Sequence, residues 1–270
     1  MKKSILITGA SSGIGKATAI YFAEKGWDVC ATMRNPDKAK DLLKYPNIQV
    51  LALDVTDEES VKDGVATALK SLGKIDVLLN NAGYGLVGAF EAMSQAQIEQ
   101  QFATNLFGVM NMTRAILPHF RAQKDGMIVN ISSLGGLISF PLNSIYLSTK
   151  WALEGFMESL QYELKPFNIQ IKNIEPGVIK TAFGDAVEFV SNKYYDGYAK
   201  AAQANMSESM KNAEEPIMVA KKVWEVVQDK SQKLRYVTGK GAKFLFLMRR
   251  LLPHTVFTKM VASQIEKGAK

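Results

Sequence analysis

The stretch Thr8-Gly9-Ala10-Ser11-Ser12-Gly13-Ile14-Gly15, TGASSGIG, lies between an apolar, β-rich run and a segment with helical spacing. Glycines at such a turn let the backbone bend sharply and approach a pyrophosphate, which the N–H groups and dipole of the helix N-terminus attract. The spacing is G-x-x-x-G-x-G, a variant of the G-x-G-x-x-G dinucleotide fingerprint. Three glycines alone are a weak signal, but their place between a strand and a helix predicts a dinucleotide-binding βαβ unit.

Apolar runs typical of buried strands alternate with helical segments along the rest of the chain. This rhythm predicts right-handed βαβ crossovers, a mostly parallel sheet, and a ligand at the carboxyl ends of the strands. Thr56-Asp57-Glu58-Glu59 is interpreted as a capping box that opens a helix. The expected strands are Ser4–Thr8, Trp27–Met33, Ile48–Leu53, Ile75–Asn80, Met127–Ser132 and Ile169–Glu175, and the expected helices include Gly13–Lys25, Asp37–Tyr45, Gln95–Phe120 and Ser144–Lys165.

We therefore expect an α/β fold with a doubly wound, mostly parallel, Rossmann-like sheet in a single domain spanning residues 1–270. The cofactor half should cover about 1–130, and the catalytic and substrate part, with a helical lid, about 131–240. A basic apolar tail, 241–270, completes the domain.

The bulk composition is ordinary for a globular protein, with 47% hydrophobic and 22% charged residues. No apolar run approaches the roughly 20 residues of a membrane span, and the apolar run of MKKSILITGA is too short for a signal peptide. Cys30 is the single cysteine, which excludes an internal disulfide and suits a reducing, cytoplasmic setting. His119 and His254 show no metal-ligand spacing, so we expect both to be structural and no metal to bind.

The net charge of +7 is concentrated at the C-terminal end, where residues 230–270 hold ten Lys or Arg and the single acid Glu266. Because only the tail is basic, no nucleic-acid partner is expected. Residues 240–260 read KGAKFLFLMRRLLPHTVFTKM, with apolar clusters between cations. Such a segment can make peripheral contact with a membrane. It can equally pack on the domain or line the substrate mouth, and packing is the interpretation we favour.

Further landmarks follow the glycine-rich turn in a fixed order, and together they resemble the short-chain dehydrogenase/reductase family, in its compact single-domain form. They lie within residues 8–181, about two-thirds of the chain. The resemblance implies a single doubly wound domain with a nicotinamide cofactor, in agreement with the strand and helix pattern. After TGASSGIG come Asp54-Val55, NNAG (Asn80–Gly83), Asn105, Ser133, the pair Tyr146 and Lys150, and PGVIKT (Pro176–Thr181).

The resemblance assigns cofactor contacts to most of these landmarks. Asp54 should contact the adenine amino group and Val55 should pack on its ring, while Lys150 holds the nicotinamide ribose. Ile179 and Thr181 resemble the residues that bind the carboxamide. The full set of expected cofactor-binding residues is Gly9, Ser11, Ser12, Gly13, Ile14, Gly15, Arg34, Asp54, Val55, Asn81, Ala82, Gly83, Tyr146, Lys150, Pro176, Gly177, Ile179 and Thr181.

The end of the second strand predicts which nicotinamide binds. An NAD site usually places an acid there, on the ribose 2′-hydroxyl. This chain instead reads CATMRN over residues 30–35, with no carboxylate. Arg34 can grip a 2′-phosphate through two parallel hydrogen bonds, and Lys16 and Ser12 are candidates to assist. We expect NADP(H) to be preferred over NAD(H), the alternative being that Arg34 is an ordinary surface cation.

Tyr146 and Lys150 lie four residues apart, on one face of the expected helix. A tyrosine with an ordinary pKa near 10 is a poor base at neutral pH. A nearby ammonium and an oxidised nicotinamide ring both favour the phenolate, by about 1–4 kcal/mol each. We therefore expect Lys150 to make Tyr146 a usable acid in reduction and a usable base in oxidation.

Two further residues complete the expected catalytic group. Ser133 ends a strand thirteen residues before Tyr146, and its hydroxyl would hydrogen-bond the substrate oxygen. Ser132 is the neighbouring alternative. By resemblance, Asn105 holds a water that relays protons through Lys150, with Asn111 a weaker rival.

The segment between Gly177 and Pro216 shows no strand pattern and corresponds to the family's variable substrate lid. It is rich in aromatic residues, and apolar residues of the rim loops face the same edge of the sheet. An apolar cleft of this kind favours a lipophilic ketone or alcohol over a sugar, unless the aromatics only pack the lid. The residues concerned are Phe183, Phe189, Tyr194, Tyr195 and Tyr198 in the lid and Tyr84, Leu86, Phe140 and Leu142 in the rim loops.

The leading expectation is an NADPH-dependent carbonyl reductase, reversible as an alcohol dehydrogenase, that acts on a steroid, retinoid or keto-lipid. The alternative is a 3-oxoacyl-thioester reductase that serves an acidic carrier protein, which the basic tail could bind. A non-catalytic cofactor-sensing regulator is disfavoured because Tyr146 and Lys150 are both present. The resemblance implies a homodimer or homotetramer formed through the helices near 95–120 and 144–165.

Overall fold

The apolar runs form a seven-stranded sheet in the computed structural model, which describes residues 2–181 and 187–266. Every pairing in this sheet is parallel, and the strand order is β3-β2-β1-β4-β6-β7-β9. Strands buried on both faces need continuous apolar sequence, as in β1, SILI. The strands are β1 (Ser4–Ile7), β2 (Asp28–Met33), β3 (Ile48–Ala52), β4 (Val77–Asn80), β6 (Gly126–Ile131), β7 (Ile169–Pro176) and β9 (Arg235–Thr238).

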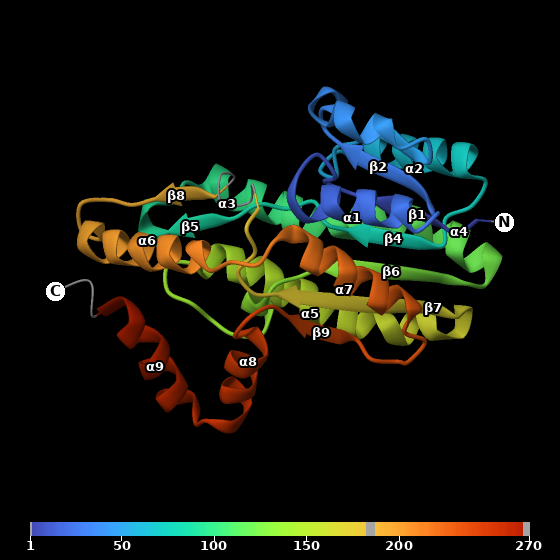
Figure 1. Cartoon of the computed structure of the whole chain (residues 1–270). Coiled ribbons are helices and arrows are strands. Elements are labelled where there is room, and N and C mark those ends of the chain that lie inside the picture. Colours follow the sequence, from blue (N-terminus) through green and yellow to red (C-terminus); the bar gives the residue numbers. More distant parts are fainter. Residues whose placement is uncertain (1, 182–186, 267–270) are drawn as a thin grey trace.

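Helices cover both faces of the sheet, which confirms the expected doubly wound, Rossmann-like single domain (Figure 1). One face packs against α1 (Gly13–Glu24) and α7 (Pro216–Gln228), where Phe22 and Val223 are fully buried. The other face packs against α2 (Glu58–Leu72), α4 (Gly108–Gln123) and α5 (Ser144–Leu164). The strand order reverses between β1 and β4, so the fold provides a crevice at the carboxyl ends of these strands.

The long helical stretch expected over Gln95–Phe120 is interrupted. It consists of α3 (Gln95–Phe102), a π-helical turn (Ala103–Phe107) and α4. Asn105 lies inside this turn and is almost fully buried. Such single turns widen a helix locally and often occur at functional sites.

Three expectations about local structure are corrected. α2 is capped by Asp57, whose carboxylate accepts from the N–H groups of Glu59 and Ser60 at 2.9 and 3.0 Å, so TDEE is not a capping box opened by Thr56. The lid segment does contain a strand, β8 (Glu188–Val190), which pairs in parallel with β5 (Leu86–Gly88) in a second, two-stranded sheet. The expected strands also omit β9, the seventh strand of the main sheet.

The lid is helical, as expected, over α6 (Asp196–Lys211). The remaining elements are short helical turns, at Pro36–Lys44, Phe90–Ala92, Leu134–Gly136 and Lys165–Phe167.

The tail forms two helices, α8 (Ala242–Leu251) and α9 (His254–Glu266), which project from the body as a V-shaped hairpin (Figure 1). Ala242, Phe257 and Val261 are buried there against Leu134 and Ile138. The tail therefore packs on the domain through one side. Among the residues that the structure describes, no helix combines the length and apolar character needed to cross a bilayer.

Candidate active site

A cavity of about 790 Å³ opens at the carboxyl ends of the central strands, where the strand order reverses. The structure brings nearly all of the predicted site residues to its wall, with Gly15 and Asn105 as the two exceptions. The predicted residues that line it are Gly9, Ser11, Ser12, Gly13, Ile14, Arg34, Asp54, Val55, Asn81, Ala82, Gly83, Ser133, Tyr146, Lys150, Pro176, Gly177, Ile179 and Thr181. Lining residues absent from that set are Met33, Leu53, Thr56, Tyr84, Gln100, Thr104, Ile131, Ser132 and Glu188.

The glycine-rich turn is held in place by the NNAG segment. Thr8 Oγ1 accepts the backbone N–H groups of Asn81 and Ala82, each at 3.0 Å. The Asn81 side chain donates back to the carbonyl oxygens of Thr8 and Gly9 at 2.9 and 3.0 Å. Thr8 follows β1 and Asn81 follows the adjacent strand β4. The four hydrogen bonds between their segments fix the glycine-rich turn against the NNAG segment.

Two of the three glycines are required by close approach. Gly9 has φ +66°, and a Cβ there would lie 2.8 Å from the Ala82 Cα. A Cβ on Gly15 would lie 2.5 Å from both the Asn81 Nδ2 and the Gly9 carbonyl oxygen. Any larger residue would push the turn away from the NNAG segment, so Gly15 shapes the cavity without lining it.

The expected adenine end of the cavity has defined side-chain positions. One oxygen of Asp54 accepts from the Thr56 backbone N–H and hydroxyl at 2.9 and 2.8 Å. The Asn111 amide donates to the Val55 carbonyl oxygen at 3.2 Å. Asn111 therefore fixes the backbone of Val55.

Arg34 and Lys16 differ in surroundings. Arg34 is exposed, follows the last residue of β2 and lines the cavity. Its charge acts on the cavity wall: burial and the Glu188 charge raise the pKa of the Tyr84 phenol, and the Arg34 guanidinium opposes them. Lys16 instead forms an ion pair with Asp41, 2.6 Å from Nζ to Oδ2, and does not line the cavity, whereas Ser12 does.

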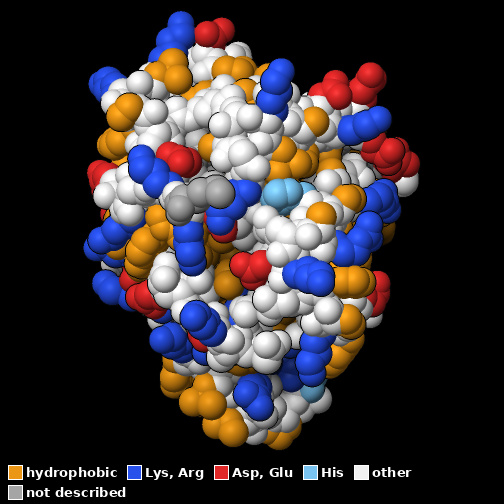
Figure 2. Space-filling model, turned by 90° about the vertical axis from the view of Figure 1, so that its right-hand side faces the viewer, with side chains coloured by type: hydrophobic (Ala, Val, Ile, Leu, Met, Phe, Trp, Pro, Cys, Tyr) orange, Lys and Arg blue, Asp and Glu red, His pale blue; other side chains and the backbone are white. Residues whose placement is uncertain are grey.

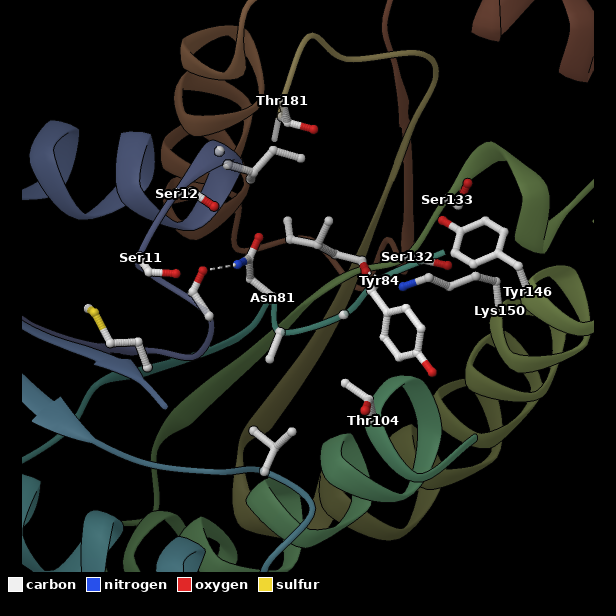
Figure 3. Close-up of a pocket in the computed structure, with 18 of the residues that line it drawn as sticks. Ser11, Ser12, Asn81, Tyr84, Thr104, Ser132, Ser133, Tyr146, Lys150 and Thr181 are labelled. Carbon is white, nitrogen blue, oxygen red and sulfur yellow. Dashed lines mark hydrogen bonds between the residues drawn. The ribbon is translucent and has the colours of Figure 1, made fainter. Parts of the chain in front are cut away.

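Ser133, Tyr146 and Lys150 converge at the opposite end of the cavity (Figure 3). Ser133 and Tyr146 share a side-chain hydrogen bond, and the Gly135 N–H donates to Ser133 Oγ at 3.0 Å. The Lys150 Nζ donates to the Ile131 carbonyl oxygen at 2.9 Å and lies 5.9 Å from the centre of the Tyr146 ring. Ser132 also lines the cavity, and its buried hydroxyl has no hydrogen-bond partner among the described residues.

The pKa of Tyr146 differs from the expectation. Burial raises it above the ordinary tyrosine value, and the hydrogen bond with Ser133 only partly opposes this. Burial also lowers the pKa of Lys150 to about 8, against the opposing charge of Glu154. Desolvation disfavours the charged form of both groups, so burial works against the expected effect of Lys150 on Tyr146.

Asn105 lies beneath the cavity. Its side-chain oxygen accepts from the Tyr84 N–H at 3.1 Å, and its amide donates to the Tyr84 carbonyl oxygen at 2.9 Å. The same amide lies 3.4 Å from Thr149 Oγ1, on the helix that carries Tyr146 and Lys150. The Asn105 side chain therefore ties the π-helical turn to the loop after β4 and to α5.

A row of polar side chains behind the site was not predicted from the sequence. Asn80, Asn130 and Asn173 occupy one register position of β4, β6 and β7 and are linked by hydrogen bonds of 2.9 Å. Asn173 continues the row to Glu154 Oε2 at 3.0 Å, and that oxygen accepts from Arg235 Nε at 2.8 Å. The signal available was an Asn at one position of each of three apolar strands, but only the register aligns them.

Glu175 is the most perturbed acid near this row. It is fully buried on β7, and neither carboxyl oxygen has a partner among the described residues. Burial, and then the charge of Glu154, raise the pKa of Glu175 to about 9. Glu175 is therefore neutral at physiological pH.

The prediction of an apolar cleft is wrong for most of the residues named for it, because they do not line the cavity. Of these, Tyr84 lines the cavity, and Gln100, Thr104 and Glu188 give the wall near it a mixed character. Leu86 is buried under the lid, and Phe140 packs with the tail helices because α8 and α9 cover that loop. Phe189, Tyr194, Tyr195, Tyr198 and Leu142 do not reach the cavity wall, and Phe183 lies outside the described residues.

Known proteins resemble this chain along most of its length. Residues 3–189 match the family described as short chain dehydrogenase. A 3-ketodihydrosphingosine reductase of Bacteroides thetaiotaomicron is 35% identical over 90% of this chain and 90% of its own length. Human retinol dehydrogenase 8 is 41% identical over 67% of this chain and 60% of its own length.

Two solved structures share the fold closely. A short-chain dehydrogenase from Streptomyces avermitilis has a TM-score of 0.84 and 32% identity, covering 100% of this chain and 98% of that one. ElxO, solved with NADP bound, has a TM-score of 0.77 and 31% identity, covering 90% of this chain and 100% of that one.

Proposed function

The chain belongs to the short-chain dehydrogenase family and is an oxidoreductase of CH–OH and C=O groups that uses a nicotinamide cofactor. On that premise, we propose that it is an NADP(H)-dependent carbonyl reductase. Its substrate would be a lipophilic ketone, and it would run in reverse as an alcohol dehydrogenase. The observation that carries the proposal is the position of Tyr146, Ser133 and Lys150 in the same cavity as the glycine-rich turn. The cavity thus holds a candidate proton donor, Tyr146, and the glycine-rich turn expected to bind the dinucleotide.

The residues present fit a dinucleotide. The turn residues Ser11, Ser12 and Gly13 line the cavity at the N-terminus of α1, where free backbone N–H groups and the helix dipole attract a pyrophosphate. Asp54, Val55, Ile179 and Thr181 all line the cavity; we assign the first two to the adenine and the last two to the carboxamide. When bound, the reduced nicotinamide supplies the hydride that adds to the carbonyl carbon.

Tyr146 donates its phenolic proton to the carbonyl oxygen as negative charge develops there. A tyrosine with a raised pKa holds this proton at neutral pH, so it is ready as an acid in reduction. Ser133 hydrogen-bonds the same substrate oxygen and the phenol, which orients both. The phenolate left behind is stabilised by the Lys150 ammonium and recovers a proton from solvent.

In the oxidative direction Tyr146 must act as a base, and burial opposes the phenolate. The positive charge of an oxidised nicotinamide ring next to the phenol would compensate for this, since opposite charges at a few ångströms favour ionisation. The oxidative direction therefore depends on the charge of the bound cofactor more than the reductive direction does.

The NADP(H) preference rests on Arg34. It lines the cavity after β2, where an NAD site usually places an acid. The 2′-phosphate of NADP would pair with its guanidinium. ElxO, a protein of similar fold, was solved with NADP bound. Other solved neighbours hold NADH or NAD, so the proposal depends on Arg34.

The lipophilic substrate class is supported by the two relatives, whose names specify a lipid ketone and a retinoid alcohol. Under the lid, Leu86, Met93 and Ile145 form a small apolar cluster beside the helix that carries Tyr146. The homodimer or homotetramer stays a prediction. Exposed Phe107 and Trp151, near the helices expected to pair, are suitable contact residues.

The test is a panel of a 3-keto long-chain base, retinal, a steroid ketone, a 3-oxoacyl carrier thioester and a keto-sugar, each scored by loss of NADPH absorbance. We expect turnover with one of the first three and at least tenfold lower kcat/KM for the sugar. Higher kcat/KM for the carrier thioester, lost at raised salt, would favour the carrier-linked alternative. Absence of NADPH oxidation with every ketone would contradict the proposal.

A further inference from the structure

The α8–α9 hairpin presents an unpaired apolar face. Phe244, Leu247 and Leu251 are 61%, 49% and 66% exposed, and their i, i+3, i+7 spacing places them on one face of α8. The opposite side of the hairpin is already packed, since Ala242, Phe257 and Val261 are buried against the domain. The exposed stripe is therefore not part of the buried cluster that packs the hairpin on the domain.

Cations flank this stripe. Lys243 and Arg250 are exposed on α8, and Lys259 is exposed on α9. Between Asp229 and Glu266 the sequence has no acid. In the described part of the chain none of these three cations forms an ion pair.

The stripe lies at the end of the molecule. Figure 2 shows hydrophobic side chains gathered at the lower tip, at the height of the α8–α9 hairpin in Figure 1, with Lys and Arg side chains around them. α9 also contacts α6, the lid helix, so the hairpin is joined to the substrate side of the protein.

We propose that the α8–α9 hairpin docks this protein on the surface of an anionic membrane. Large apolar side chains enter the interface between headgroups and acyl chains, while flanking Lys and Arg remain among the anionic headgroups. α8 has 10 residues and α9 has 13, so both helices are too short to span and suit a position in the interface. An acidic protein would satisfy the cations but would still have to cover the apolar stripe.

This inference goes beyond the proposed function and does not depend on it. Docking would also bring the lid helix close to the bilayer, because α9 contacts α6. The assay below measures binding alone, so its failure is distinct from a failure of catalysis.

The test is flotation of the full chain with vesicles of phosphatidylcholine, with and without phosphatidylglycerol. We expect binding to the anionic vesicles, and weaker binding at raised salt because salt screens the cations. The triple variant Phe244→Ser/Leu247→Ser/Leu251→Ser removes the apolar stripe. The double variant Lys243→Glu/Arg250→Glu reverses the charge of two cations that flank it. Each combined variant should lower the partition coefficient by about tenfold or more.

A matched control carries Leu43→Ser/Phe90→Ser, two residues that are 62% and 61% exposed elsewhere on the surface, and should float like the wild type. Thermal unfolding of every variant shows whether it is folded. No flotation of the wild type, or equal flotation of the folded stripe variant, would overturn the proposal. A further result would also overturn it. If light scattering shows that the wild type is an oligomer, that the stripe variant is not, and neither binds vesicles, then a second copy of the chain covers the stripe.

Discussion

The Lys150 ammonium donates a 2.9 Å hydrogen bond to the carbonyl oxygen of Ile131, the last residue of β6. This bond anchors the lysine at the edge of the sheet, with its Nζ 5.9 Å from the centre of the Tyr146 ring. Lys150 is thus held by the strand that precedes Ser133, so the three side chains keep a fixed arrangement before any substrate binds.

Tyr146→Phe should abolish turnover and leave cofactor affinity nearly unchanged. The substitution removes the proton donor but keeps the ring that packs in the cavity. Stopped-flow reduction of the best ketone and NADPH titration by fluorescence would measure the two effects. Tyr162→Phe, on an exposed position of the same helix, is the control and should keep the wild-type rate. More than a tenth of the wild-type rate in Tyr146→Phe would contradict the assignment.

Ser133→Ala and Ser132→Ala separate the two candidate serines. Ser133 shares a hydrogen bond with Tyr146, while the Ser132 hydroxyl is buried without a partner among the described residues. Loss of a donor to a developing oxyanion costs about 10²–10³-fold in kcat. We expect that loss for Ser133→Ala and less than a tenfold loss for Ser132→Ala. The reverse order would move the role to Ser132.

Lys150→Met should change how stability depends on pH. The Lys150 pKa falls from 10.5 to about 8 on folding, so between these values the unfolded chain binds more protons. Its contribution to the free energy of unfolding therefore rises with pH, with a slope of up to about 1.4 kcal/mol per unit. Urea unfolding of wild type and variant at pH 7.5–10 without cofactor gives the difference. A wild-type minus variant difference that is flat or falls over this range would refute the burial of the ammonium.

Glu175→Gln should show the opposite sign. The Glu175 pKa rises from 4.5 to about 9 on folding, so the folded chain binds more protons between these values. The stability contributed by the neutral acid is fully present below the unfolded value and is lost as pH rises towards the folded one. The wild-type minus variant difference in unfolding free energy should therefore fall from pH 5 to 9. An unchanged difference would mean that the carboxyl ionises without cost.

Local patterns predicted well which residues line the cavity, because its turns depend on adjacent residues. The glycine-rich turn, NNAG and the Tyr146/Lys150 spacing are each read within a few residues of sequence. The short strands β8 and β9, of 3 and 4 residues, carry too little alternation to stand out. Their pairing partners lie far away in sequence, so register and packing determine them.

The remaining differences come from burial and tertiary contact. No sequence pattern shows that burial raises the pKa of Tyr146 and lowers that of Lys150, because the depth of the pair is set by the whole fold. The position of Phe140 also depends on tertiary contact. It follows β6 and was expected at the substrate cleft, yet it packs with the tail helices. The asparagine row likewise exists only because three strands align in register.

Arg34→Ala should raise the KM for NADPH and leave that for NADH nearly unchanged. Hydrogen bonds to a charged group contribute about 1.5–3 kcal/mol, which corresponds to a roughly 10–100-fold change in affinity. Lys16→Ala is the matched control: this lysine is on the neighbouring helix but already pairs with Asp41 at 2.6 Å, so its loss should change the NADPH KM less than threefold. Initial rates with both cofactors at fixed ketone concentration measure all three proteins. Equal catalytic efficiency of the wild type with NADPH and NADH, or an equal loss with both in Arg34→Ala, would show that the guanidinium does not select the 2′-phosphate.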